Sequence, residues 1–251
     1  MGVRLAAGLP EHPLPALPSR HVRHSLPASG RPPLDGPKTC DASGMIEIHR
    51  MFRRSFAEAP DLVRGVAEGD VAHAAVVARQ LGLVSTSLHA HHEGEDARLW
   101  AVIDDRAPSC AAHVERMKAQ HAAMLVHLDA LDAALPALRE RPTAGTAEPI
   151  LEALAGIDAA LGVHLPDEET TIVPVMEHVM TEDETDWFAK HGRAATPKGE
   201  GWNMLGAILA AQPDGGDAWL KAHLPGPAAL VWRWVGRPRY RRFRAELEGR
   251  A

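Results

Sequence analysis

The chain has 251 residues, 45% of them hydrophobic and 24% charged, a composition typical of soluble globular proteins with one large domain or two small ones. No apolar run approaches the roughly 18 residues of a membrane span. The two cysteines, Cys40 and Cys110, are too few for a disulfide framework, which favours a reducing, cytoplasmic location. The net charge of −6 argues against a nucleic-acid partner. Histidine is unusually frequent, with 15 residues, and it is the commonest metal ligand.

Charge and proline content divide the chain into segments. Residues 1–44 have a net charge of +2 and hold eight of the 20 prolines without an apolar period, which predicts a disordered proline-rich tail. Residues 45–229 have a net charge of −13, and residues 230–251 have one of +5. We expect a helical bundle over residues 45–180 and a helical C-terminal extension over residues 181–251.

Four helices and no strands are predicted for the bundle, so the expected fold class is all-α. Prolines and glycines separate the helices. Asp70 and Ser109 are candidate N-caps of the second and third helices. Two further short helices are expected at residues 60–68 and 182–191.

An internal repeat relates the second helix to the fourth, because both carry the same stripe along one helix face. The stripe of the second helix is Val77, Leu81, Val84, Leu88, His91, Glu95, Leu99 and Val102. The stripe of the fourth, shifted throughout by 73 residues, is Ile150, Leu154, Ile157, Leu161, His164, Glu168, Ile172 and Val175. In both stripes a histidine and a glutamate interrupt aliphatic residues at the same two places.

The first and third helices share a shorter stripe, shifted by 72 residues, with one histidine in each. Its members are Met45, His49, Phe52 and Phe56 in the first helix and Met117, His121, Met124 and Leu128 in the third. The doubled helix pair therefore directs four imidazoles and two carboxylates into one bundle core.

Such polar groups in an apolar core need partners, because a lone buried carboxylate costs several kcal/mol or takes up a proton. The i,i+4 spacing lets His91–Glu95 and His164–Glu168 each present an imidazole and a carboxylate to one point. Bundle cores hold di-iron and di-manganese sites of this kind, whereas structural zinc more often uses thiolates. A single core histidine is more often a hydrogen-bonded side chain than a ligand, but the same pair within two aliphatic stripes favours metal.

The polar pattern resembles that of the hemerythrin-like proteins with an HHE cation-binding domain, and the C-terminal stretch resembles extensions of the actinobacterial-type members. Their signature is His, His-x-x-x-Glu, His and His-x-x-x-Glu on successive helices. Its members in this sequence are His49 in IHRMF, His91 and Glu95 in HHEGED, His121 in AQHAAM, and His164 and Glu168 in HLPDEE. The resemblance implies an up-down-up-down four-helix bundle in which these six residues hold two non-haem iron ions, with manganese less favoured.

The sequence departs from the oxygen-carrying hemerythrins. Met117 stands four residues before His121, where those proteins have another histidine, and Glu168 stands in place of a longer-spaced aspartate. A missing imidazole leaves one iron more open and favours reactive chemistry over reversible oxygen carriage. Pro166 lies inside the fourth-helix motif and predicts a kink there.

Several polar residues beside the second-helix motif are not expected to be ligands. His89, His92 and Glu93 are predicted to point away from its face, and His92 would be a ligand only in an alternative register with Asp96. Asp96, and Glu169 of the fourth helix, follow the ligand glutamates. They are either contacts behind the ligands or part of a solvated charged face.

The C-terminal extension is rich in tryptophan and arginine. Five of the six tryptophans follow residue 180, and the chain ends in the basic, aromatic stretch WRWVGRPRYRRFRAE before its last residues. Three interpretations stay open. The segment packs its aromatic residues on the bundle and covers the metal site, binds an anionic membrane surface or nucleic acid, or forms a partner or dimer contact.

The combined interpretation is a cytoplasmic non-haem di-iron protein that binds dioxygen or a related small oxidant, in oxygen or redox sensing or handling. One alternative is an enzyme that removes peroxide or nitric oxide. Another is an iron-responsive interaction protein whose bundle is stabilised by metal. No transmembrane segment and no nucleic-acid partner are expected, and the protein partner and the presence of catalysis stay open.

Overall fold

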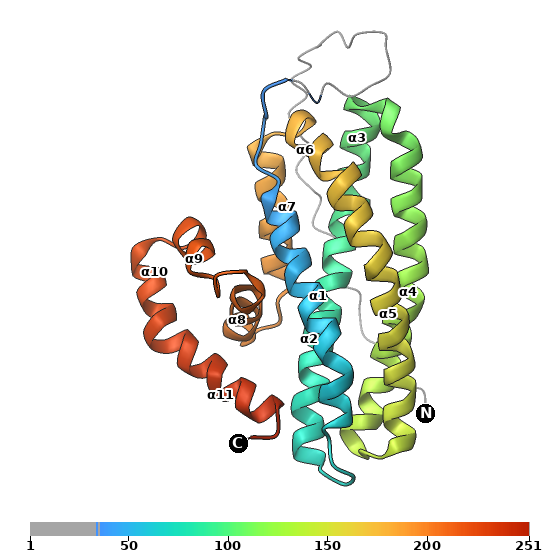
Figure 1. Cartoon of the computed structure of the whole chain (residues 1–251), viewed down its shortest axis with the longest axis vertical. Coiled ribbons are helices and arrows are strands. Elements are labelled where there is room, and N and C mark those ends of the chain that lie inside the picture. Colours follow the sequence, from blue (N-terminus) through green and yellow to red (C-terminus); the bar gives the residue numbers. More distant parts are fainter. Residues whose placement is uncertain (1–33, 35, 251) are drawn as a thin grey trace, which may run out of the picture. The chain divides into compact units, whose positions relative to one another are not determined.

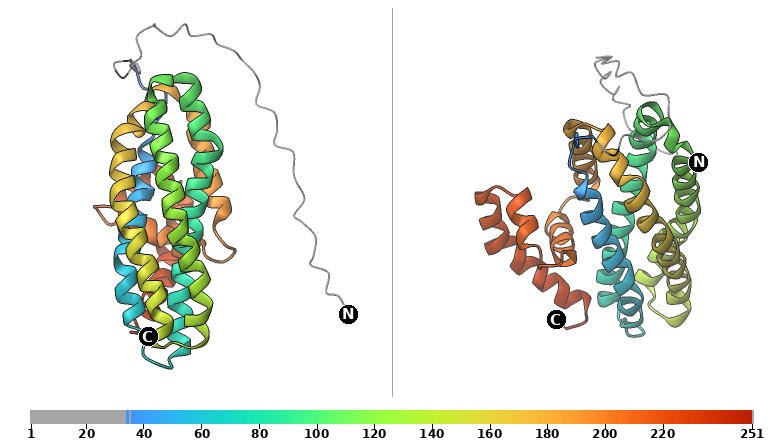
Figure 2. Two further views of the ribbon diagram at one scale, coloured as in Figure 1. Left: turned by 90° about the vertical axis from the view of Figure 1, so that its right-hand side faces the viewer. Right: turned by 45° about the horizontal axis from the view of Figure 1, so that its top comes forward.

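The computed structural model describes Leu34 and residues 36–250, and all regular structure in this part of the chain is helical, which confirms the predicted all-α fold. Four long antiparallel segments form a bundle (Figures 1 and 2). They are α1 (Ser43–Arg64), α2 (Val71–Gly94) continued by η1 (Glu95–Leu99) and α3 (Trp100–Arg106), α4 (Ala111–Glu140), and α5 (Ala144–Thr171) continued by α6 (Val173–Val179). Both α1 and α4 pack on α2 and α5, so the four segments close a ring in up-down-up-down order.

The proline-rich tail expected over residues 1–44 lies mostly outside the described residues. Its described end contacts the bundle before Met45. The backbone N–H of Thr39 donates to the carbonyl of Glu177 at 2.7 Å, and Cys40 is buried with its Sγ 3.3 Å from the carbonyl of Met176. These contacts supply hydrogen-bond donors to backbone carbonyl groups in the C-terminal turn of α6.

The helix boundaries follow the capping signals in part. The predicted N-cap Asp70 accepts a hydrogen bond at 2.9 Å from a backbone N–H of the first turn of α2. The expectation that Ser109 caps the third long helix is wrong, because Pro108–Cys110 form a 3-10 turn (η2) before α4 begins. The separate helix expected at residues 60–68 is also wrong, since α1 continues through this region to Arg64.

Two of the four segments change their helical geometry just beyond the glutamates of the repeat. The π-helical turn η1 adds one residue to a turn, so Ile103 is fully buried while Val102, expected on the stripe, is partly exposed. In the fourth segment the break lies between α5 and α6, where Pro174 lacks a backbone N–H. Helix α5 itself continues through Pro166, where the sequence predicts a kink, and the helix ends only at Thr171.

The bundle interior consists of two apolar clusters with a polar layer between them. The first cluster includes Phe52, Phe56, Leu88, Met124, Leu128 and Leu161. The second includes Met45, Leu99, Trp100, Ile103, Met117 and Ile172. The histidines and glutamates of the four stripes lie between these two sets along each helix, so apolar side chains shield the polar layer from water at both ends.

The C-terminal extension packs on the bundle as a second group of helices (Figure 1). It consists of α7 (Glu182–Ala195), α8 (Gly201–Ala211), α9 (Asp217–His223), α10 (Gly226–Val231), η3 (Trp232–Gly236) and α11 (Arg237–Leu247). Helix α7, which confirms the short helix expected at residues 182–191, contacts α2, whereas α8 contacts α1 and α11 contacts α8 and α2. Polar contacts fix the arrangement, among them Trp219 Nε1 to Glu47 at 2.8 Å and Arg244 to Glu58 at 2.6 Å. Within the described residues, no helix combines the length and hydropathy that crossing a bilayer requires.

A substitution at Gly206 tests the contact between α8 and α11. A Cβ atom at Gly206 would lie 2.2 Å from the ring of Tyr240, so Gly206→Ala is expected to destabilise the docking of α11 by about 1–3 kcal/mol. Hydrogen exchange should then rise in α11 and not in α4. Gly192→Ala is the matched control, because nothing lies within 4 Å of a Cβ atom there. Unchanged exchange in α11 of Gly206→Ala would contradict this packing.

Candidate metal centre

The six side chains predicted as ligands lie at one level of the bundle, within the polar layer. They are His49 on α1, His91 on α2, Glu95 at the start of η1, His121 on α4, and His164 and Glu168 on α5. Five of them are at most 4% exposed, and the side chain of His91 is 10% exposed. Side chains from all four segments of the bundle therefore meet in a space closed to bulk solvent.

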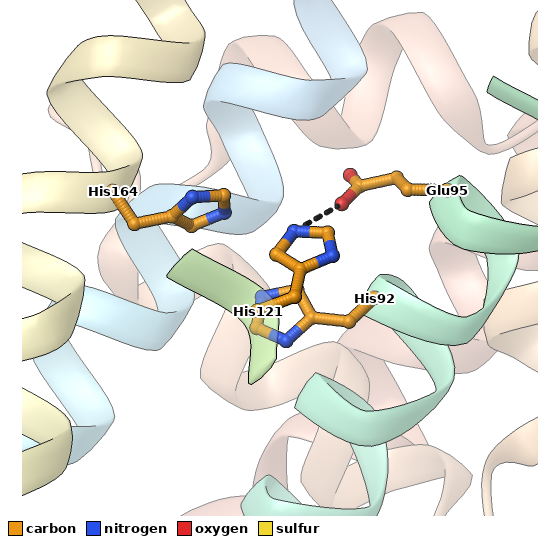
Figure 3. Close-up of side chains that lie close together, drawn as sticks. All are labelled: His92, Glu95, His121 and His164. Atoms are coloured by element: carbon orange, nitrogen blue, oxygen red, sulfur yellow. Dashed lines mark ion pairs between the residues drawn. The ribbon is translucent and has the colours of Figure 1, made fainter. Parts of the chain in front are cut away.

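Each carboxylate lies between imidazoles of two different helices. For Glu95, Oε1 is 3.1 Å from His91 Nε2. Its Oε2 is 3.3 Å from His121 Nε2, the ion pair drawn in Figure 3. This carboxylate thus joins α2 to α4.

Glu168 has the equivalent place in the other half of the repeat. Its Oε2 lies 3.4 Å from His49 Nε2 and 3.5 Å from His164 Nε2. The Nε2 atoms of His49 and His91 are themselves only 3.2 Å apart. The Nε2 atoms of these histidines and the carboxylates of Glu95 and Glu168 therefore lie close together in the centre of the bundle.

Two groups of four residues result, and in each the potential ligand atoms lie within 4.8 Å of one another. One group is His92, Glu95, His121 and His164 (Figure 3), and the other is His49, His91, Glu95 and Glu168. Glu95 belongs to both groups, so they adjoin through a shared carboxylate.

His92 is the member of these groups that the sequence interpretation missed. It is 6% exposed, and its ring stacks on that of His121 with the centroids 4.0 Å apart. The expectation that it points away from the site is therefore wrong. On a helix, Glu95 lies about 40° from His91 and about 60° from His92, so all three face a wide core. The i,i+3 spacing of His92 and Glu95 is the signal that could have found it.

The outer ring nitrogens of three of the histidines have acceptors behind them. The contacts are His49 Nδ1 to Glu169 at 3.0 Å, His121 Nδ1 to Asp96 at 2.9 Å, and His164 Nδ1 to Gln120 at 3.0 Å. When Nδ1–H donates to its acceptor, Nε2 carries the lone pair and directs it inward, as a metal ligand requires. Asp96 and Glu169 thus lie behind the rings of His121 and His49, in agreement with one of the two alternatives from the sequence, whereas Gln120 was not expected.

Buried polar atoms of the layer lack hydrogen-bond partners. In the described chain nine buried side-chain nitrogen and oxygen atoms have none, and seven of these belong to the layer. They are Nε2 of His92, His121 and His164 and both carboxylate oxygens of Glu95 and Glu168. Leaving such atoms unsatisfied is costly, and coordination of cations would satisfy them. The donors are nitrogen and oxygen atoms only, which fit iron and manganese.

Burial changes the protonation of both carboxylates. Removal from water raises the pKa of Glu95 and of Glu168 above the ordinary value, and the neighbouring Glu95 charge raises the pKa of Glu168 further. Behind them, burial opposes ionisation of Glu169, but hydrogen bonds from His49 and Arg53 outweigh it and lower the pKa of Glu169 to about 2. Glu169, behind the ring of His49, is thus charged, whereas burial favours the protonated form of Glu95 and Glu168.

Burial keeps most of the imidazoles neutral. It lowers the pKa of His91 and His92 well below the ordinary value and that of His164 to about 3. Burial also opposes a charge on His121, but the hydrogen bond to Asp96 and the nearby carboxylate of Glu95 outweigh it and raise the pKa of His121 to about 9. Neutral rings are the form that binds metal.

Other polar residues near the motif point away from the layer, as expected. His89 pairs with Asp132 at 3.2 Å, and Glu93 is exposed. Helix α7 of the extension packs on α2 at Gly94, where a Cβ atom would lie 3.1 Å from His191. This contact supports the interpretation that the extension packs on the bundle beside the site.

Comparison with known proteins agrees with this geometry. The family model of the hemerythrin HHE cation binding domain matches residues 42–176, which extend from the start of α1 into α6 and include every member of both groups. Searches of curated proteins and of solved structures each found no match. Since the matched segment spans more than half of the chain, the protein belongs to the hemerythrin HHE cation-binding family.

Proposed function

We propose that this protein is a non-haem di-iron protein that binds dioxygen or a related small oxidant. The observation that carries the proposal is the pair of four-residue groups that share Glu95. One group offers three imidazoles and one carboxylate, and the other offers two of each. Two ions so held would each keep coordination positions for small molecules.

The donor set supports iron. Neither group contains a thiolate, and Cys40 and Cys110 are free thiols buried in the apolar cluster away from the layer. Five imidazoles with two carboxylates suit iron, with manganese as the less favoured metal. The two free thiols also support a reducing, cytoplasmic location as part of the proposal.

A bound pair of iron ions would supply open coordination positions and electrons for a small oxidant. The chain supplies the surroundings. Asp96, Glu169 and Gln120 orient the rings through Nδ1, and the two apolar clusters exclude water. Glu95 and Glu168 give up any protons they hold when cations bind, which couples loading to pH.

His92 bears on the choice between binding and turnover. Taken alone, methionine instead of histidine at position 117 favours reactive chemistry. The structure brings His92 beside His121 instead, so the number of imidazoles in the layer is five. This count supports small-molecule binding ahead of the alternative, removal of peroxide or nitric oxide.

The proposal is tested by loading the full chain anaerobically with ferrous iron and measuring metal content by mass spectrometry. We expect two irons per chain, and a large loss from both positions in Glu95→Gln because both groups use this carboxylate. The visible spectrum should change with dioxygen and return when the gas is removed. Sustained consumption of peroxide would favour the enzyme alternative.

His92→Ala and His89→Ala form a matched pair for this experiment. His92→Ala is expected to reduce iron content because one group loses an imidazole, whereas His89→Ala should keep the wild-type content because His89 pairs with Asp132 outside the layer. A wild-type protein that retains no metal after reconstitution would refute the proposal.

Replacement of the residues behind the rings should weaken iron binding without removing a ligand. We expect Asp96→Asn and Glu169→Gln each to lower iron affinity about 10–100-fold, because His121 and His49 lose a charged acceptor for Nδ1–H. Competition with a chelator measures the affinity. Glu93→Gln, on the exposed face of α2, is the control. Equal affinities in all three variants would mean that these contacts do not support the metal.

The pKa of Glu168 gives a prediction for protein stripped of metal by a chelator. Because burial raises this pKa above the ordinary 4.5, the folded state holds the proton more tightly than the unfolded chain, and stability falls as pH rises above about 4.5. Glu168→Gln should therefore show a smaller decrease in Tm on going from acid to neutral pH than the wild type. Added iron should raise Tm in the wild type far more than in the variant. Circular dichroism measures both, and parallel pH profiles would contradict the assignment.

A further inference from the structure

Exposed apolar side chains cluster on one short stretch of the C-terminal extension. Nine large hydrophobic residues are exposed in the described chain, and four of them lie between residues 230 and 235. They are Leu230 at 57%, Val231 at 47%, Trp234 at 73% and Val235 at 39% exposure. We call these four residues the Trp234 surface.

The Trp234 surface faces solvent, because the opposite face of the same helical segment packs against other helices of the extension and the bundle. Trp232, Phe243 and Leu247 are buried on that face. Gly236 lies so close to the rings of Trp202 and Trp232 that a Cβ atom would be 2.6 and 2.4 Å from them. Helix α8 lies between this segment and α1 (Figures 1 and 2), so the exposed face is directed away from the bundle.

Unpaired arginines border the Trp234 surface. The stretch from residue 226 to 245 contains six arginines and no acidic residue. Arg242 and Arg244 pair with glutamates. In the described chain no ion pair involves the other four, which are exposed: Arg233, Arg237, Arg239 and Arg241. The surface therefore combines aliphatic side chains and an exposed indole with guanidinium groups whose charges have no carboxylate opposite.

We propose that the Trp234 surface docks on an anionic phospholipid bilayer. The apolar side chains enter the boundary between headgroups and acyl chains, where the amphipathic indole of Trp234 is favoured. The arginines bind lipid phosphates, since guanidinium matches phosphate oxygens in bidentate geometry. The bundle with its polar layer stays in the aqueous phase beside the membrane.

The same residues disfavour two other occupants. A second copy that used the same surface would bring the arginines of both copies together, a repulsive arrangement. Nucleic acid would engage the arginines and the indole but offers no apolar partner to Leu230, Val231 and Val235. An anionic bilayer satisfies the charge and the apolar area together.

Co-sedimentation of the full chain with vesicles tests the proposal. We expect binding to phosphatidylcholine vesicles that contain phosphatidylglycerol, weaker binding at high salt, and little binding to phosphatidylcholine alone. The exposed pair R237Q/R241Q should lower the partition coefficient about 25-fold, at about fivefold per charge. The pair L230S/W234S should lower it at least about tenfold.

Matched controls lie on α4. Arg139→Gln removes an exposed arginine that has no ion pair in the described chain, and Val126→Ser removes a side chain that is 66% exposed. Both should bind vesicles as the wild type does, and circular dichroism checks the fold of every variant. Absence of vesicle binding would overturn the proposal, as would equal binding by all variants. A dimer that only L230S/W234S dissociates, or duplex DNA binding without vesicle binding, would assign the surface to the other occupants instead.

Discussion

The rest of the structure depends on one constraint, the burial of two carboxylates and five imidazoles at a single level of an apolar bundle. In water each of these groups would be fully solvated, and in the bundle most of their inner atoms have no protein partner. An apolar cluster lies on either side of this layer, and removal of the hydrophobic side chains of both clusters from water stabilises the bundle around it. The clusters stabilise the bundle, and cation binding would satisfy the inner polar atoms of the layer itself.

The repeated stripes explain why so much of this layer could be predicted from the sequence. A histidine and a glutamate four residues apart within an aliphatic face can only reach the core, and the same pattern in two helices places both pairs at one level. The positions of His49, His91, Glu95, His121 and the α5 pair all follow from regular helical periodicity. The capping aspartate of α2 could be read from local chemistry in the same way.

What could not be predicted depends on departures from regular geometry and on contacts between helices. The π-helical turn η1 changes the phase of α3, so Ile103 takes the buried position expected for Val102. His92 is buried because the core at this level is wide enough for two adjacent positions of α2, a width that one helix cannot reveal. Gln120 supports His164 across the interface between α4 and α5 and carries no mark of this role in the sequence.

The sequence also could not predict which face of the C-terminal helices packs on the bundle, since a helix with tryptophan on several faces has no single apolar stripe. Its direction is settled by close packing at Gly206 and Gly236, where rings of Tyr240, Trp202 and Trp232 need the space of a side chain. These glycines let α11 and η3 approach α8, and this approach leaves Trp234 outside. Composition predicted helices here, but only the packing separates the aromatic residues into inner and outer ones.

The hydrogen bond from His121 to Asp96 has a consequence for how the layer communicates with solvent. The Asp96 side chain is 51% exposed and also accepts from the indole of Trp100 at 2.6 Å, so one carboxylate touches both bulk water and a ring of the sealed layer. The polar layer is therefore buried but still connected to solvent through the Asp96 carboxylate. The apolar clusters shield the inner nitrogens from water, whereas Asp96 links the outer nitrogen of the His121 ring to the solvent-exposed surface through one hydrogen bond.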